Sequence, residues 1–256
     1  MTDRQNPFGF LAHPVTAAGL LTAWITLLLV FNGEPQWDLA SSAWFFDSQA
    51  CAASQAADGR RCLGFTVSVA EMPRAIREFL HPLPTILCLL VAAVLAVELR
   101  SGLRWRFPGI RLKTVLVTTL IIGPGLLVNG VLKAHWGRPR PWMTEEFGGW
   151  LPFVEAGTKT GYCASNCSFV SGEASTAGWL MCLALMLAIR RRRIFAALVA
   201  AVSIVMAAMR VVFGAHYLSD AILGYLSTIV IFSVLAVVSE WIAERRQRQS
   251  DACAQP

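Results

Sequence analysis

The chain has 256 residues, of which 55% are hydrophobic and only 15% are charged. This composition is too apolar for a water-soluble domain and indicates a polytopic membrane protein. The formal net charge of +6 would suit a nucleic-acid partner, but the basic residues lie mostly in short segments between apolar runs, where they act as topology signals. We therefore expect the lipid bilayer, and not nucleic acid, to be the partner of this protein.

Six apolar segments are candidates for membrane-spanning helices, at residues 14–31, 82–97, 114–132, 174–189, 194–209 and 221–238. Gly123-Pro124-Gly125 predicts a kink in the third of these segments. The first could instead be a cleaved signal peptide, but little positive charge precedes it, so we expect a retained helix. The sequence thus predicts an all-α bundle of six transmembrane helices that forms one domain over residues 1–256.

Two long polar segments, residues 32–81 and 133–172, connect predicted spans on one side of the membrane, whereas the connections on the other side are short and rich in arginine. By the positive-inside rule, the basic segments at 100–113 and 190–193 lie in the cytoplasm, as does the basic C-terminal tail. Both termini are then cytoplasmic and the two long segments are outer loops. We expect 32–81 to be a loop on the membrane surface, with its aromatic residues at the interface.

Four of the seven cysteines lie in these outer loops, namely Cys51, Cys62, Cys163 and Cys167. An oxidising outer compartment permits disulfides, and four cysteines allow three connectivities. Pairing within each loop, Cys51 with Cys62 and Cys163 with Cys167, is the simplest of the three. A metal site is the alternative, but no histidine lies near these cysteines in the sequence. We expect neither a metal nor a cofactor.

Three polar clusters stand at the outer ends of the predicted helices. They are Lys133-Ala134-His135-Trp136-Gly137-Arg138-Pro139-Arg140-Pro141, Ser168-Phe169-Val170-Ser171-Gly172-Glu173 and Arg210-Val211-Val212-Phe213-Gly214-Ala215-His216-Tyr217-Leu218-Ser219-Asp220. Ionisable residues at a membrane boundary are costly unless they have a function. Each cluster also has a plain structural explanation, because basic side chains can snorkel to the interface, a Ser-Gly pair can cap a helix and a histidine can bond to a local aspartate. The three together favour an anion-binding site.

The residue types suit a phosphate. Lysine and arginine bind phosphate oxygens and stay charged at working pH, and Ser171 with Gly172 at a helix start can offer hydroxyl and backbone donors. If His216 and Asp220 occupy the first turns of a helix, their i, i+4 spacing places both on one face. The carboxylate could then hold one imidazole nitrogen and leave the other free to attack phosphorus.

The patterns Lys-x6-Arg-Pro at 133–141, x-Ser-Gly-x at 170–173 and Arg-x5-His-x3-Asp at 210–220 resemble the three signature motifs of the type 2 phosphatidic acid phosphatase family. This family shares its site with the vanadium haloperoxidases, and its membrane branch has six helices with the motifs on the outer face. The resemblance covers about residues 114 to 238. It implies a metal-independent site with the following roles: Lys133, Arg140 and Arg210 bind phosphate, Ser171 and Gly172 line it, His216 is the nucleophile and Asp220 orients His216.

Three positions depart from the family pattern. Val170 stands where the family usually has proline, and Met209 where it usually has serine. Glu173 replaces the usual histidine that protonates the leaving group. A carboxylic acid can do this only if its pKa is raised; the helix N-terminus and nearby cations oppose such a rise, while desolvation and a bound phosphate favour it. We expect the bound phosphate to raise the pKa of Glu173 enough for it to donate a proton. His135 is an alternative acid.

The resemblance implies a lipid phosphatase that acts at the periplasmic face of the bacterial inner membrane through a phosphohistidine. The substrate classes are lipid A, undecaprenyl diphosphate, and phosphatidic acid or phosphatidylglycerophosphate. A weak acid at position 173 favours a good leaving group, such as a sugar-1-phosphate or a pyrophosphate, and Ser-Phe-Val-Ser-Gly-Glu is also similar to bacterial lipid A phosphatases. A lipid phosphotransferase and a non-catalytic protein that binds or translocates lipid phosphates are the alternatives. A transporter is less favoured, because no paired broken helices occur in matching halves.

Overall fold

The computed structural model describes residues 6–58 and 62–253, and within these ranges the chain is helical with a single isolated β-bridge between Thr144 and Leu151. The α-helices are α1 (Pro14–Gly33), α2 (Gln36–Ala43), α3 (Ser48–Asp58), α4 (Glu71–Leu80), α5 (Leu83–Arg100), α6 (Pro108–Leu120), α7 (Lys133–His135), α8 (Gly172–Ile189), α9 (Arg193–Val212) and α10 (Leu218–Cys253). The π-helix η3 (Ile121–Leu132) joins α6 to α7, and the short 3-10 helices are η1 (Gly9–Ala12), η2 (Thr66–Ser68), η4 (Pro141–Met143) and η5 (Glu145–Phe147).

The described chain contains six helical segments that are long and apolar enough to cross a membrane. They are Pro14–Gly33, Glu71–Arg100, Pro108–His135, Gly172–Ile189, Arg193–Val212 and Leu218–Ser250. Each contains one predicted span, so the prediction of an all-α protein with six spanning helices is confirmed. Several helices extend beyond the predicted ends. In particular, α10 continues through the basic segment that follows residue 238.

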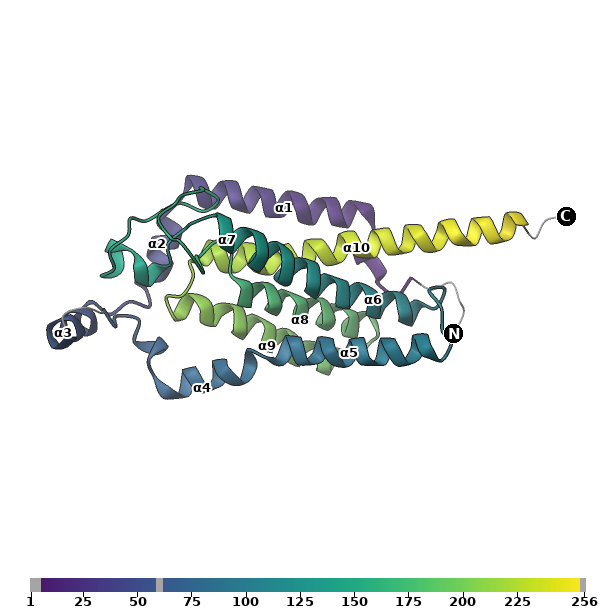
Figure 1. The fold of residues 1–256 in the computed structure, drawn as a ribbon, viewed down its shortest axis with the longest axis horizontal. Helices are drawn as coiled ribbons and strands as arrows, with labels where there is room; N and C mark the ends of the chain where they lie inside the picture. The colour runs from purple at the N-terminus through teal and green to yellow at the C-terminus, as the bar shows by residue number, and fades with distance from the viewer. Residues whose placement is uncertain (1–5, 59–61, 254–256) are drawn as a thin grey trace.

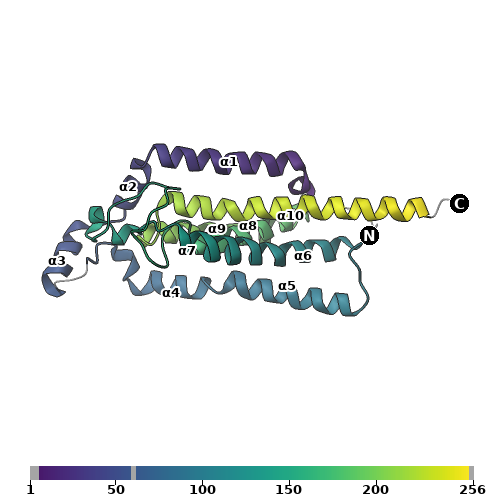
Figure 2. The ribbon, with the colours of Figure 1, turned by 45° about the horizontal axis from the view of Figure 1, so that its top comes forward.

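Helices α8 and α10 form the centre of the bundle, with α1 and α5 along opposite edges (Figures 1 and 2). More than half of the apolar window of α8 and α10 is buried, whereas most of α1 and α5 is exposed. Small residues allow the close approach, because a Cβ at Gly178 of α8 would lie 2.3 Å from the carbonyl oxygen of Tyr225 in α10. Trp179 is fully buried and donates its indole N–H to the Leu116 carbonyl at 2.7 Å.

The irregularity predicted at Gly123-Pro124-Gly125 takes the form of a π-helix. Pro124 lies inside η3, where its ring cannot donate a backbone hydrogen bond. The amide of Asn129 donates to the Pro124 carbonyl at 2.7 Å, which satisfies an acceptor in the widened turns. This helix leads directly into Lys133 at the site described below.

The outer segment at 32–81 is not the surface loop that we expected. It contains helices α2, α3 and α4, and α4 leads into α5. The reason lies in its tertiary contacts, since Phe46 and Phe65 pack with Phe147 of the second outer segment at centroid distances of 5.3 to 5.6 Å. These rings hold the short helices of this segment in place. A search for long apolar runs does not detect such helices.

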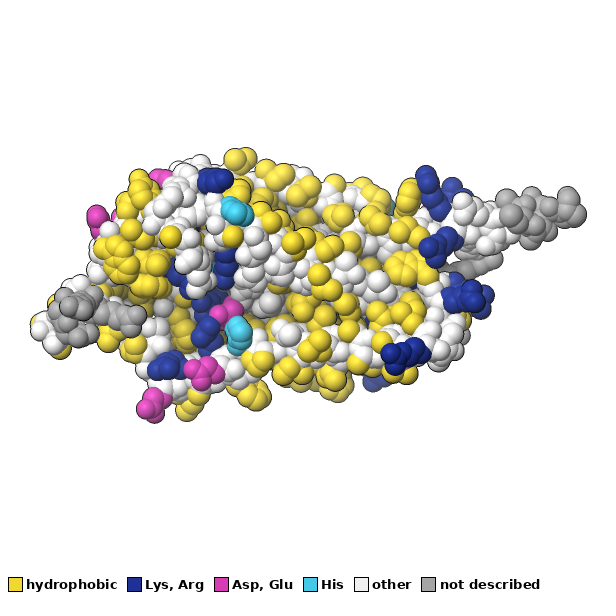
Figure 3. Space-filling view, viewed as in Figure 1, with side chains coloured by type: hydrophobic (Ala, Val, Ile, Leu, Met, Phe, Trp, Pro, Cys, Tyr) yellow, Lys and Arg dark blue, Asp and Glu magenta, His cyan; other side chains and the backbone are white. Residues whose placement is uncertain are grey.

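Both disulfides predicted within the outer segments are confirmed. Cys51 is bonded to Cys62 and Cys163 to Cys167, while Cys88 and Cys182 are free and buried. Cys253 lies at the end of α10, and its side chain is outside the described part. The visible face of the molecule has an apolar belt between two ends that carry charged side chains (Figure 3), as expected for a bilayer protein.

Candidate active site

His216 lies in the turn between α9 and α10 and is only 1% exposed. Its Nδ1 is 2.9 Å from the carbonyl oxygen of Ser168. Because a carbonyl can only accept, Nδ1 carries the proton and Nε2 keeps its lone pair. In the part of the chain that the structure describes, His216 has ring hydrogen bonds only through Nδ1 and only to Ser168. The imidazole is therefore held in the tautomer that a nucleophile needs.

The electrostatic surroundings of His216 keep it neutral. Burial lowers the pKa of His216 well below its usual value of 6.5, and the positive charges of Arg210, Arg140 and Lys133 lower it further. The same three cations are the predicted phosphate ligands. They therefore surround the predicted nucleophile in the folded protein.

The predicted contact between Asp220 and His216 is absent from the described hydrogen bonds. His216 precedes α10, which begins at Leu218, so the two residues do not share a helical face. The hydroxyl of Ser168 donates to the Asp220 carboxylate, while the carbonyl of Ser168 accepts from His216. The helical i, i+4 interpretation was wrong, and Ser168 links the two side chains.

Arg138 is the residue that holds Asp220. It is fully buried and contacts two carboxylates, that of Asp220 at 2.7 Å and that of Asp38 in α2 at 2.7 Å. It also donates to the Val154 carbonyl at 2.8 Å, and its guanidinium lies 4.5 Å from the Tyr217 ring centroid. Burial opposes the charge, but Asp220 and Asp38 outweigh it and raise the pKa of Arg138. All three guanidinium nitrogens of Arg138 thus have a partner in the protein.

Lys133 and the start of α8 lie against each other. Ser171 is the N-cap of α8 and its hydroxyl accepts from the Ala174 backbone N–H at 3.3 Å. A Cβ at Gly172 would lie 2.7 Å from Asn129 Oδ1 and 3.2 Å from Lys133 Nζ, so a larger residue would require both side-chain ends to shift. The Ser-Gly pair is therefore a cap that also admits Lys133.

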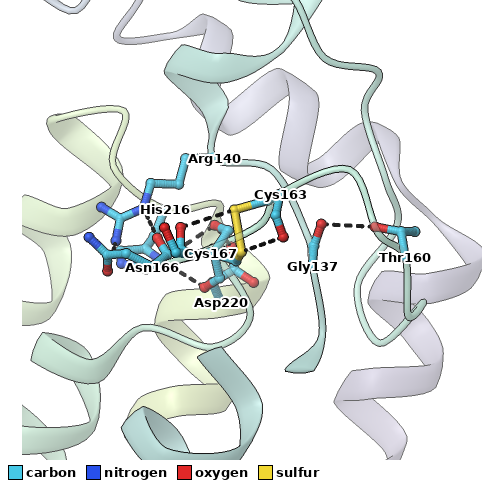
Figure 4. Close-up of a disulfide and its surroundings, with 10 residues drawn as sticks. Gly137, Arg140, Thr160, Cys163, Asn166, Cys167, His216 and Asp220 are labelled. Carbon is cyan, nitrogen blue, oxygen red and sulfur yellow. Dashed lines mark hydrogen bonds between the residues drawn. A yellow bond between two sulfur atoms is a disulfide. The ribbon is translucent and has the colours of Figure 1, made fainter. Parts of the chain in front are cut away.

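Arg140 is held by the small loop that the second disulfide closes. Its Nε donates to the Asn166 carbonyl at 2.9 Å and an Nη donates to Asn166 Oδ1 at 2.7 Å. Figure 4 shows this guanidinium reaching over His216 toward Asn166, next to the Cys163–Cys167 bond. Burial lowers the pKa of Arg140, and the charges of Asp220 and Glu173 partly compensate.

Glu173 is ion-paired with two arginines. Its carboxylate accepts from Arg77 Nε of α4 at 3.1 Å and lies 3.1 Å from an Nη of Arg210. Arg77 also reaches the second carboxylate oxygen through an Nη. Arg210 is only 5% exposed, and among the described residues its Nε has no hydrogen-bond partner. A buried guanidinium with an unused donor is chemically suited to binding an anion.

A cavity of about 380 Å³ opens beside this arrangement. Arg77, Arg140 and Arg210 line it together with apolar residues such as Trp142. His216 is next in the chain to Ala215, which also lines the cavity. The predicted alternative acid, His135, is exposed and is not among the lining residues. Among the described residues, no group of three His, Cys, Asp or Glu side chains is placed to hold a metal.

The family comparison agrees with this geometry. A model of the PAP2 superfamily matches residues 112–244, which contain all three polar clusters. The chain belongs to the PAP2 superfamily. The relationship suggested by the motifs is therefore confirmed.

Curated relatives of this PAP2 protein extend the match beyond the signature region. It is 43% identical over 233 residues to a lipid A 4′-phosphatase of Rhizobium leguminosarum, covering 91% of this chain and 99% of the relative. It is 42% identical to the Rhizobium etli protein of the same name, with 91% and 90% covered. A lipid A 4′-phosphatase of Francisella tularensis subsp. novicida is 40% identical over 125 residues, or 47% and 56% of the two chains. No solved structure matches.

The structure brings all eight predicted site residues to one end of the bundle, but sequence reasoning missed four that organise them. From the sequence, no role was assigned to Arg77, Arg138 or Ser168. Asp38 lay in a segment that was expected to be a surface loop. Only the spacing of Arg138, two residues before Arg140 in the same cluster, could have pointed to it. Asp38 has no local signal, because its partner is 100 positions away.

Proposed function

We propose that this PAP2 protein is a lipid A phosphatase that removes a 4′-phosphate through a phosphohistidine at His216. The observation that carries the mechanism is the tautomer of His216, whose Nδ1–H donates to Ser168 and leaves Nε2 free among three cations. The names of the relatives that match over most of their length support the substrate.

The periplasmic face of the bacterial inner membrane is the side that fits best, with both termini in the cytoplasm. The site shares its end of the bundle with both disulfides, which persist in oxidising compartments. The arginine-rich segments 100–113 and 190–193 lie in the connections on the other side. Reaction with a membrane-impermeant thiol reagent after reduction, in intact spheroplasts, tests this orientation through Cys163 and Cys167.

In the first step, the Nε2 lone pair of His216 attacks phosphorus. The bond between phosphorus and the sugar oxygen breaks, and its electrons leave with that oxygen, which takes up a proton. Lys133, Arg140 and Arg210 balance the charge on the phosphoryl oxygens. The imidazole keeps its Nδ1 proton, and the Ser168 carbonyl stabilises the positive charge that the ring gains.

In the second step, water attacks the phosphohistidine, the P–N bond breaks and inorganic phosphate leaves. Water gives up one proton in this step, and the group that protonated the leaving oxygen can accept it. Each turnover therefore returns the site to its starting protonation state. No other reactant is required.

We assign the proton transfer to Glu173. In the unliganded site two guanidinium groups stabilise its carboxylate, so proton uptake has to follow substrate binding. A phosphate that takes over Arg210 removes one of these cations and brings negative charge close to Glu173. A 4′-phosphate is an ester of an ordinary alcohol, so its leaving group needs the proton more than that of a sugar-1-phosphate or a pyrophosphate, the classes that the sequence favours.

Purified protein in detergent micelles, given lipid A with a labelled 4′-phosphate, should release inorganic phosphate without a lipid acceptor and should form an acid-labile, alkali-stable phosphoenzyme. His216→Ala should form neither. Glu173→Gln should still form some phosphoenzyme with an aryl phosphate, whose leaving group needs no proton, but should not turn over lipid A. Phosphate release by His216→Ala at the wild-type rate would refute the mechanism, and transfer only to an added lipid would identify a phosphotransferase.

A further inference from the structure

Arg77 belongs to α4, which lies outside the segment that matches the family model. The half-buried residues of α4 are Pro73, Arg77 and Leu80, and the other residues of the helix are exposed. Their spacing of four and three residues defines one helical face, which is turned toward the bundle. Arg77 is thus the charged residue on the inner face of α4.

The guanidinium of Arg77 is only partly used by the protein. Glu173 occupies its Nε and one Nη, and within the described residues no other hydrogen-bond partner contacts it. The side chain is 35% exposed and lines the cavity that Arg140 and Arg210 also line. Unlike Arg210, which is almost completely buried, Arg77 can be reached from outside.

One flank of α4, beside the inner face, is apolar and exposed, whereas Glu71 and Glu78 lie on the side turned away from the bundle. Met72 and Phe79 are 73% and 78% exposed, and α4 continues into the membrane-spanning α5. Leu63 and Val69, which precede α4, are also exposed and line the cavity. Arg77 therefore lies where a surface suited to acyl chains meets the cavity that Arg140 and Arg210 line.

The charges of the site indicate what Arg77 can bind. Lys133, Arg140 and Arg210 surround His216, and each of them lowers its pKa, whereas Arg77 is not among the groups that do so. Three cations suffice for a phosphate dianion. Arg77 is 35% exposed, lines the cavity and offers a planar fork with free donors.

We propose that Arg77 determines specificity for the lipid substrate by binding its polar headgroup outside the phosphate that is transferred, with Glu173 as the residue that positions the guanidinium. This inference rests on the proposed function. It predicts that a small soluble phosphate ester, which lacks the rest of the headgroup, does not use Arg77.

The test compares Arg77→Gln with the matched control Arg74→Gln in the full-length protein. Arg74 carries the same charge on the same helix, but it is exposed and does not line the cavity. Arg77→Gln should raise KM for lipid A in mixed micelles about tenfold, the effect of one charge-assisted hydrogen-bonding group. It should leave kcat/KM for p-nitrophenyl phosphate within about twofold, because this ester lacks the headgroup and its leaving group needs no proton from Glu173, the partner of Arg77. Arg74→Gln should change neither value. Arg77→Lys should show an intermediate KM for lipid A. It replaces Arg77→Gln in the comparison if Arg77→Gln does not fold.

Two outcomes would overturn the role of Arg77 without affecting the proposed function. One is an unchanged KM for lipid A in a variant that binds detergent and unfolds like the wild type. The other is an equal loss on both substrates, which would mean that Arg77 acts on the transferred phosphate or on the fold. A wild-type protein that hydrolyses p-nitrophenyl phosphate but not lipid A would instead refute the proposed function itself.

Discussion

Arg138 and Arg210 are two buried arginines at the same end of the bundle, yet their surroundings differ in a way that separates structure from function. Arg138 is fully buried, and its donors contact Asp38, Asp220, Ser219 and a backbone carbonyl. Arg210 shares the Glu173 carboxylate with Arg77, and its Nε has no hydrogen-bond partner within the part of the chain that the structure describes. A saturated guanidinium maintains a fold, whereas one with unused donors beside a cavity is available to a ligand.

Replacing Arg138 should have the largest effect. Arg138→Met leaves two carboxylates buried without their counter-charge, so we expect a loss of about 3–5 kcal/mol in unfolding free energy and no measurable activity. Thermal unfolding in detergent, followed by tryptophan fluorescence, measures this loss. Arg210→Gln is the control and should unfold within about 1 kcal/mol of the wild type. Equal stability of the two variants would contradict the distinction between the two arginines.

Replacing Arg210 should affect catalysis more than folding. Arg210→Gln removes a preorganised donor to the phosphoryl oxygens, and we expect kcat/KM for lipid A to fall by about 100- to 1000-fold. Initial rates of phosphate release measure this fall. Arg210→Lys, which keeps the charge but loses the fork, should recover part of the rate. Full activity of Arg210→Gln would mean that its free donor does not face the substrate.

Asn166 offers a smaller perturbation, because it acts through Arg140. Asn166→Ala removes the side-chain acceptor and leaves the backbone acceptor, so we expect about a tenfold loss in kcat/KM from a less well-fixed guanidinium. The neighbouring Ser165→Ala is a suitable control, since the hydroxyl of Ser165 has no described hydrogen bond. If both variants have equal rates, the disulfide loop does not position Arg140.

The pH dependence should show the smallest change. His216 reacts in its neutral form, so activity is lost as the pH falls through its pKa, and the wild-type acid limb of kcat/KM should lie well below pH 6.5. Arg140→Gln removes one of the cations that lower this pKa, so the acid limb should move to higher pH. Asn166→Ala retains the charge and should keep the limb near its wild-type position. An unshifted limb in Arg140→Gln would mean that another group controls it.

The sequence made the spanning helices and the motif residues accessible to prediction. Apolar runs of membrane length and dense basic connections are local signals, because the bilayer imposes the same constraint on every crossing segment. Lys133, Arg140 and His216 were recognised from short spacings within single clusters. The two disulfides followed from proximity in sequence, since Cys51 is separated from Cys62 by 11 residues and Cys163 from Cys167 by 4.

By itself, the sequence determined the class of protein, the number of crossings and the phosphatase family, and it led to the proposal of His216 as the nucleophile, because composition and short motifs carry that information. Only the tertiary structure decided how His216 is held and that Arg138 has a structural role. It also showed that α4 contributes Arg77 to the site. Asp38 meets Arg138 and Arg77 meets Glu173 across 100 and 96 positions. Such pairs form when helices pack and polar groups removed from water must find partners, a condition that no local pattern records.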